Sequence, residues 1–217
     1  MNQLVTEMEM LEKMIFQSKQ KIISTNIHPQ EIEWNPKLIS DDTIFGKRES
    51  IIHYDLKKYI KYDDLIEVLS YTDRYSNQFL GDSNFQIEQI VIPERVDGIV
   101  GNRHFYTFDA KNKELHNHYI LPVTIDKREL VIQEEFAQAG VIILFVASID
   151  EAFQKSGALG YKKLVQNIGA MGHYTWMQAL SYGYEGSVFA GFLQKSLRKI
   201  TDVDGYQKAQ LFAIAIG

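Results

Sequence analysis

The sequence of 217 residues contains no cysteine. This absence excludes disulfide bonds, thiolate metal sites and a cysteine nucleophile, and it is compatible with the cytoplasmic location that we expect. The formal net charge is −5, and no basic block of the kind that contacts nucleic acids is present. No apolar run is long enough to span a bilayer, and the N-terminus MNQLVTEMEMLEK is too acidic and polar for a signal peptide. We therefore expect neither a nucleic acid nor a membrane as a partner.

Several common catalytic motifs are also missing. The sequence has no GxGxxG, no GxxxxGK[ST] and no GxSxG. His116 and His118 would share one face of a strand, which is a spacing that metal ligands can adopt. A third ligand is not evident, and exposed histidines are common on strands. We therefore predict no metal site.

The hydrophobic pattern divides the chain into an N-terminal arm, 1–40, and a folded domain, 41–217. An amphipathic helix is predicted over 3–23, and a connection that contains two prolines follows over 24–40. The apolar stripe of this helix comprises Leu4, Met8, Leu11 and Ile15. The remaining residues are enough for one domain with a hydrophobic core.

Within the folded domain, helices and strands interleave without a strict βαβ rhythm, which indicates an α+β layered domain. The predicted strands are 85–93, 104–109, 115–120, 140–148 and 209–216. The predicted helices begin at Asp63 and cover 128–138 and 161–182. The run GVIILFVAS is continuously apolar, as expected for a strand that is buried on both faces.

The long predicted helix over 161–182 is rich in small residues, and a lone Lys155 and a glycine turn precede it. Gly169, Ala170 and Gly172 leave part of its surface almost without side chains. A glycine inside a helix costs about 1 kcal/mol relative to alanine, so a close contact should offset that cost. A partner helix, a flat ligand or tight packing in the core would each provide such a contact.

Two further segments have the residue types of a cofactor site. Gly191 interrupts the strand-like run GSVFAGFL, where a glycine marks either a bulge or a close approach to the backbone, whose N–H could donate to a ring nitrogen. Arg48 and Ser50 are two residues apart and would point the same way on an extended segment. A guanidinium and a hydroxyl on one side can bind a phosphate, although a solvated surface arginine is the alternative.

In their order and spacing these segments resemble the nitroreductase-like flavoprotein superfamily, and within it the peptide azoline dehydrogenases of streptolysin S-type biosynthesis. Arg48-Glu49-Ser50 resembles the Arg-x-Ser motif of the family. Ala190-Gly191-Phe192 resembles the strand on which a backbone amide meets flavin N5. The run from Lys155 to Lys162 resembles the segment that carries the catalytic lysine.

The resemblance implies a mixed central sheet flanked by helices, in a homodimer with FMN at the subunit interface. It implies Arg48, Ser50, Ala190 and Gly191 as FMN-binding residues and Lys155 as the catalytic residue. The implied activity is an FMN-dependent oxidation of azolines to azoles in a modified peptide. The implied partners are a peptide or small-molecule substrate and a cyclodehydratase.

The sequence also departs from the family pattern. Ser156 replaces the tyrosine that follows the catalytic lysine, and Ile52 replaces a second arginine after the Arg-x-Ser motif. The Pro-Ser-Ala-Gly flavin loop is not recognisable in SNQFLGDSNFQ. Two alternatives therefore stay open, a non-catalytic partner subunit of a peptide-modifying complex and a general NAD(P)H-dependent flavin or nitro reductase.

Overall fold

The computed structural model describes residues 44, 46–79, 85–100 and 103–217. The predicted helix over 3–23 and the connection over 24–40 lie outside the described residues, so the boundary at residue 40 stays a prediction. No helix among the described residues has both the length and the apolar character needed to cross a membrane.

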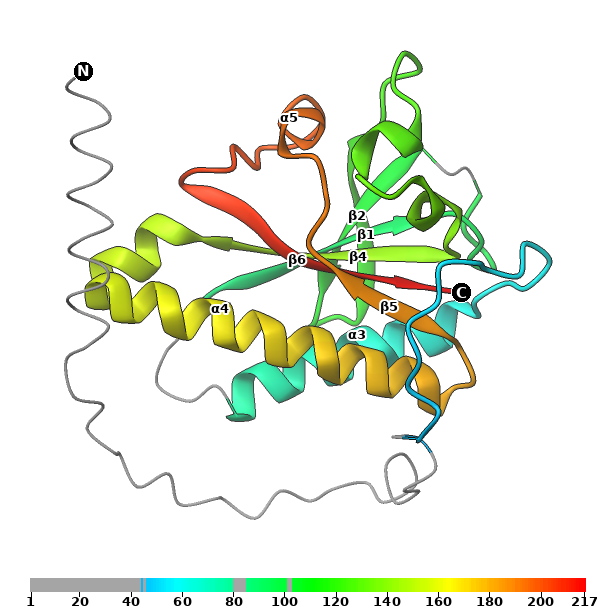
Figure 1. Cartoon of the computed structure of the whole chain (residues 1–217), viewed down its shortest axis with the longest axis horizontal. Coiled ribbons are helices and arrows are strands. Elements are labelled where there is room, and N and C mark those ends of the chain that lie inside the picture. The colour runs from blue at the N-terminus through cyan, green and yellow to red at the C-terminus, as the bar shows by residue number, and fades with distance from the viewer. Residues whose placement is uncertain (1–43, 45, 80–84, 101–102) are drawn as a thin grey trace.

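A six-stranded sheet with the order β3-β2-β1-β4-β6-β5 forms the centre of the molecule (Figure 1). Adjacent strands pair antiparallel, and parallel pairing occurs at the isolated bridges Ser50–Gly186 and Ile60–Val96. The strands are β1 Ile87–Pro93, β2 His104–Asp109, β3 Glu114–Ile120, β4 Val141–Ser148, β5 Gly186–Phe189 and β6 Lys208–Ile216. The predicted α+β fold, a central sheet with helices on its faces, is confirmed.

The helices cover both faces of this sheet. Two long helices, α3 and α4, lie side by side on one face, and the short α5 lies on the other (Figure 1). Their bounds are α3 Tyr62–Phe79, α4 Ile149–Ser181 and α5 Gln194–Leu197, with the short 3-10 helices η2 Lys127–Leu130 and η3 Glu134–Gln138. A buried hydrogen bond of 2.8 Å between the hydroxyls of Thr72 and Thr175 joins α3 to α4.

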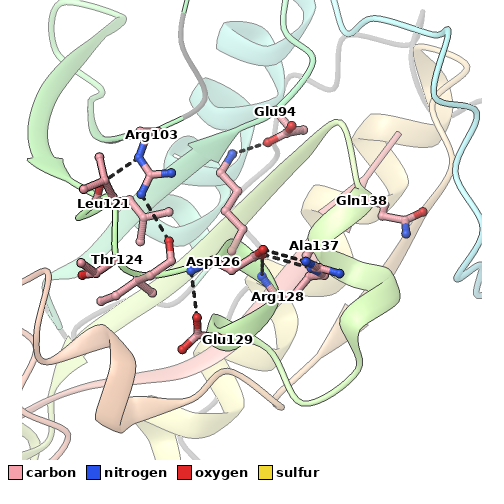
Figure 2. A pocket seen from close by; sticks show the side chains of 12 residues that line it. Glu94, Arg103, Leu121, Thr124, Asp126, Arg128, Glu129, Ala137 and Gln138 are labelled. Atoms are coloured by element: carbon pink, nitrogen blue, oxygen red, sulfur yellow. Dashed lines mark hydrogen bonds and ion pairs between the residues drawn. The ribbon is translucent and has the colours of Figure 1, made fainter.

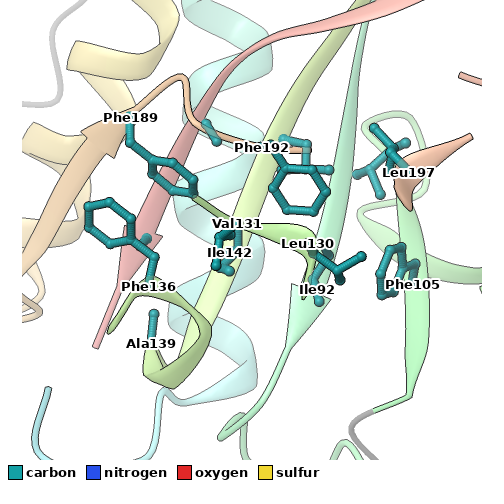
Figure 3. Packing of buried hydrophobic residues seen from close by; sticks show 14 of the residues in the cluster. Ile92, Phe105, Leu130, Val131, Phe136, Ala139, Ile142, Phe189, Phe192 and Leu197 are labelled. Carbon is teal, nitrogen blue, oxygen red and sulfur yellow. The ribbon is translucent and has the colours of Figure 1, made fainter. Parts of the chain in front are cut away.

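Two hydrophobic cores lie on opposite faces of the sheet, and the central strand β4 contributes to both. Ile142, Leu144 and Val146 face the α5 side, whereas the residues between them face α3 and α4. The prediction that this strand is buried on both faces is confirmed. On the α5 side, the rings of Phe136 and Phe189 stack with centroids 4.3 Å apart and join η3 to β5 (Figure 3).

Helix α4 begins earlier than the predicted Tyr161. Ser148 caps it, since the Ser148 hydroxyl accepts from the backbone N–H of Glu151 at 3.0 Å. The predicted glycine turn is a break inside the helix, at Ser156 and Gly157, where Gly157 has φ 56° and ψ −142°. A glycine adopts this conformation without a steric penalty. Lys155 therefore lies on the helical segment before the break and not in a turn ahead of the helix.

The predicted helix over 128–138 is wrong. The segment forms η2 and η3, and Val131 between them is extended, with φ −123° and ψ 148°. Val131 forms an antiparallel bridge with Phe192, and the N–H of Ile132 donates to the carbonyl of Gly191 at 2.8 Å. Tertiary pairing of these two β-branched residues with the segment after β5 interrupts the helix.

The patch of small residues on α4 has two different environments. Gly172 is buried, and a Cβ at this position would lie 2.6 Å from the ring of Phe212 on β6. Gly169 is exposed, with nothing within 4 Å of such a Cβ. Gly172 therefore serves the packing of α4 on the sheet, which is one of the three contacts that the sequence left open, whereas Gly169 does not take part in this packing.

Candidate functional site

The segment that contains Arg48 and Ser50 is fixed against the start of β5. Ser50 forms a parallel bridge with Gly186, and the hydroxyl of Ser187 donates to the carbonyl of Ile51. Arg48 itself is exposed, and its guanidinium lies 5.1 Å from the ring centroid of the buried Trp176. Stacking of this kind restrains a guanidinium and leaves its edge free to donate hydrogen bonds.

Ala190 and Gly191 lie directly after the other end of β5. The carbonyl of Gly191 accepts from Ile132, whereas its N–H has no acceptor among the described residues. A Cβ on Gly191 would lie 3.4 Å or more from the side chain of Ile132, which is an ordinary contact. Packing within the chain therefore does not require a glycine here. Beside this free N–H, the apolar side chain of Ile132 is 67% exposed.

Four of the five predicted site residues thus lie at the two ends of one strand. β5 is the terminal strand of the sheet, so its outer edge is not paired with another named strand of the described residues. From Gly186 to Gly191 an extended chain covers about 16 Å, at about 3.3 Å per residue. The edge of β5 therefore has the Arg48 guanidinium and the Ser50 hydroxyl near one end and a free backbone donor at the other.

Lys155 lies elsewhere in the same chain. The part of α4 from Gly157 to Trp176 is about 28 Å long at 1.5 Å per residue, so Lys155 and Arg48 are at opposite ends of this helix. The Lys155 ammonium is 2.6 Å from a carboxylate oxygen of Glu151 and 5.5 Å from the ring centroid of Phe85. The length of α4 therefore separates Lys155 from Arg48 within a single chain.

Sequence reasoning missed His173, which belongs to the Arg48 end of the site. His173 precedes Trp176 by three residues, so both project from the same side of α4. Partial burial lowers the pKa of His173, and the positive charge of Arg48 lowers it further. The available signal was the run His173-Tyr174-Thr175-Trp176, but its spacing is also that of an ordinary core helix.

A polar cavity of about 590 Å³ is lined in part by the residues of η2 (Figure 2). The sequence did not predict this cavity. Lys127 extends along its wall and donates to the carbonyl of Pro93 at 3.0 Å and to the carboxylate of Glu94. Burial lowers the pKa of Lys127, and the nearby charge of Arg103 also disfavours the ammonium, although the ion pair with Glu94 opposes both.

The other charges of the cavity stabilise the turn that leads into η2. Arg103 donates to the carbonyls of Leu121, at 3.1 Å, and of Pro122 and Ile125. Asp126 caps η2, and the guanidinium and backbone N–H of Arg128 lower the pKa of Asp126 to about 2. These contacts hold the segment that supports Ile132 beside Gly191. No three His, Asp or Glu side chains of the described ranges form a cluster that could bind a metal ion.

Comparison with protein families finds that residues 46–217 match the nitroreductase family. A comparison with curated proteins gives no match. The family match includes Arg48 and Ser50, both ends of β5, and all of α4.

Solved structures with a similar fold include a chain from Anabaena variabilis assigned to the nitroreductases, with a TM-score of 0.64 and 20% identity. The match covers 81% of this chain but only 37% of the Anabaena chain. A structure of the E. coli microcin synthetase McbBCD complex with truncated pro-MccB17 bound matches at a TM-score of 0.62 and 14% identity, over 95% of this chain and 81% of the other. A protein from Exiguobacterium sibiricum assigned to the nitroreductases, in complex with FMN, matches at 0.53 and 11%, over 80% and 85%.

At these identities the structural likenesses show the fold alone. The match over residues 46–217 shows the family, in agreement with the resemblance that the motifs predicted. The chain belongs to the nitroreductase family.

Proposed function

We propose that this protein is an FMN-dependent oxidoreductase whose cofactor lies along the outer edge of β5. The observation that carries the proposal is the pair of donor groups at the two ends of this strand. Arg48 and Ser50 lie near Gly186 at one end, and the free N–H of Gly191 lies beyond the other end, after a segment that covers about 16 Å when extended. This separation suits an elongated cofactor with a phosphate at one end and a ring system at the other.

The residues present fit this cofactor. Gly191 carries an N–H without an acceptor among the described residues, at a position where packing would accept a side chain. A backbone donor that must approach a flat ring explains a glycine that the chain itself does not need. Ile132, exposed beside it, offers apolar surface to such a ring. FMN is bound in the related structure from Exiguobacterium.

When bound, FMN supplies the hydride acceptor, and the protein supplies position and electrostatics. Arg48 offsets the charge of the phosphate, and Ser50 adds a hydroxyl donor. The Gly191 N–H orients the ring by donating to a ring nitrogen. Ile132 excludes water from that part of the ring.

We propose a modified peptide that contains azolines as the substrate. Oxidation of an azoline to an azole removes two hydrogens from the ring, one as a proton to a base and one as a hydride to the cofactor, and a new ring double bond forms. The likeness to the microcin synthetase complex supports a peptide substrate. In this proposal a cyclodehydratase partner forms the azoline that this protein oxidises.

Lys155 is the proposed base, and it acts from a second copy of the chain. The length of α4 separates it from Arg48, which lies at the phosphate end of the proposed flavin site in the same chain. Leu159 and Val165 are exposed apolar residues on α4, 44% and 43% accessible, and they supply surface for a homodimer contact. To accept a proton, Lys155 must leave its ion pair with Glu151.

The second candidate is a non-catalytic partner subunit. The observation that favours it is the ion pair of 2.6 Å between Lys155 and Glu151. This ion pair engages the side chain that the resemblance implies as the catalytic base. A colourless protein that does not take up added FMN would support this candidate. Rapid bleaching of bound flavin by NAD(P)H without any peptide would instead support a general reductase.

Replacing Arg48 by alanine tests the flavin site. We expect the affinity for FMN to fall about tenfold to a hundredfold, because a charge-assisted contact to phosphate contributes about 1.5–3 kcal/mol. Isothermal titration of the flavin-free protein measures this change. Lys47→Ala, which removes a neighbouring exposed lysine, is the matched control and should bind FMN normally. Equal affinities in the parent and Arg48→Ala would remove Arg48 from the site.

A further inference from the structure

His173 and Arg48 form a pair of basic groups on the exposed side of α4. The guanidinium of Arg48 lies over Trp176, one turn beyond His173 on the same side of the helix. Burial lowers the pKa of the His173 imidazole, and the positive charge of Arg48 lowers it further. The chain thus places an imidazole on the same side of α4 as a fixed positive charge.

Within one turn of His173 on α4 no residue carries a carboxylate. One turn away on α4 are Gly169, Ala170, Trp176 and Met177, none of which titrates. The segment before Ser50 contributes Arg48, and the residues on either side of it are Lys47 and Glu49.

Helix α3 packs against α4 through Tyr75 and Tyr174, whose rings stack with centroids 4.2 Å apart. Arg74 and Tyr71, which also lie on α3, contribute to the shift in the pKa of Tyr174. Among the described residues no carboxylate forms an ion pair with His173. The anion that would balance this pair of basic groups is therefore not supplied by this part of the chain.

We propose that His173 is a second ligand of the flavin phosphate and takes up a proton when the phosphate binds. This inference rests on the proposed function. A phosphate monoester carries a charge of about −1.5 to −2 near neutral pH, and Arg48 alone offsets only one unit. Ile52 follows Ser50 by two residues and brings no charge to the same segment. A protonated His173 supplies the missing charge.

The proposal predicts that FMN binding depends on pH. The lowered pKa of His173 favours the neutral imidazole in the free protein, and the proposal has it charged in the complex, so the protein takes up a proton when it binds FMN. FMN affinity should therefore increase about fivefold to tenfold as pH falls from about 8.5 to 6.5, a range in which the phosphate stays largely dianionic. Riboflavin, which lacks the phosphate, should show no such dependence.

The experiment compares FMN and riboflavin affinities at pH 6.5, 7.5 and 8.5 in the parent, His173→Gln and His53→Gln. His53 is an exposed histidine near Arg48 and Ser50, so its variant is the matched control and should keep the dependence. His173→Gln should bind FMN at every pH with an affinity close to that of the parent at high pH. Equal pH dependence in the parent and His173→Gln would overturn the proposal, and so would equal dependence for FMN and riboflavin.

A second measurement does not rely on a variant. Proton NMR of the His173 imidazole should show that its pKa rises when FMN is added and stays unchanged when riboflavin is added. An unchanged pKa in the FMN complex would contradict the proposal while leaving FMN binding intact. Absence of any FMN binding by the parent would instead contradict the proposed function itself.

Discussion

Replacing Lys155 by alanine should slow the reduction of bound flavin by an azoline peptide about a hundredfold to ten-thousandfold, the usual contribution of a positioned acid or base. FMN content and melting temperature should stay near those of the parent, because the Lys155–Glu151 pair is partly exposed and such pairs contribute little to stability. Anaerobic stopped-flow absorbance of the flavin measures the rate. Lys163→Ala, which removes another exposed lysine of α4, is the control and should react normally.

The same variant tests whether Lys155 acts on the flavin of a second chain. In a dimer that mixes Lys155→Ala with Arg48→Ala, one site receives Arg48 from the first chain and Lys155 from the second, and is intact. At an FMN concentration that saturates the parent but not Arg48→Ala, random mixing at equal amounts leaves roughly one site in four intact, so activity should return above that of either variant alone. If both residues acted within one chain, mixing would restore nothing. Flavin reduction by Lys155→Ala at the parent's rate would make Lys155 a surface residue.

Replacing Gly172 by leucine should destabilise the fold by about 3 kcal/mol, the upper part of the range for overpacking. A Cβ at this position already lies 2.6 Å from two ring atoms of Phe212, and the longer leucine side chain would extend further into the contact between α4 and β6. Denaturant unfolding measures the loss. Gly169→Ala, three residues earlier on the same helix, should be neutral or stabilise by up to about 1 kcal/mol, because that position is open. Equal losses in both variants would contradict the packing of α4 on the sheet.

The strands were predictable because local pattern and tertiary environment agree. β2 covers 104–109 as predicted, and the apolar run of β4 is buried on both faces. The start of α4 was missed because its cap, Ser148, lies at the end of a strand, where an apolar run masks the signal. The segment 128–138 was missed because its pairing partner, 191–193, is more than fifty residues away, and no local pattern encodes that contact.

The candidate site was predictable only in part. The motifs predicted Arg48, Ser50, Ala190 and Gly191, and the structure adds that β5 places them at its two ends. Nothing in the local sequence shows that Ser50 pairs with Gly186, because this bridge joins segments 136 residues apart in sequence. The supporting residues Ile132 and His173 were not predicted. An exposed isoleucine, or an aromatic residue on a helix, has the pattern of an ordinary surface or core position.

The most direct test of FMN binding along the edge of β5 is the titration of ¹⁵N-labelled protein with FMN, followed through the amide signal of Gly191. We predict saturable binding in which the Gly191 N–H and the side-chain Nε–H of Arg48 shift together, since one ligand would contact both ends of β5. Saturable FMN binding that leaves both signals unchanged would place the cofactor elsewhere, and no binding at all would contradict the proposed function.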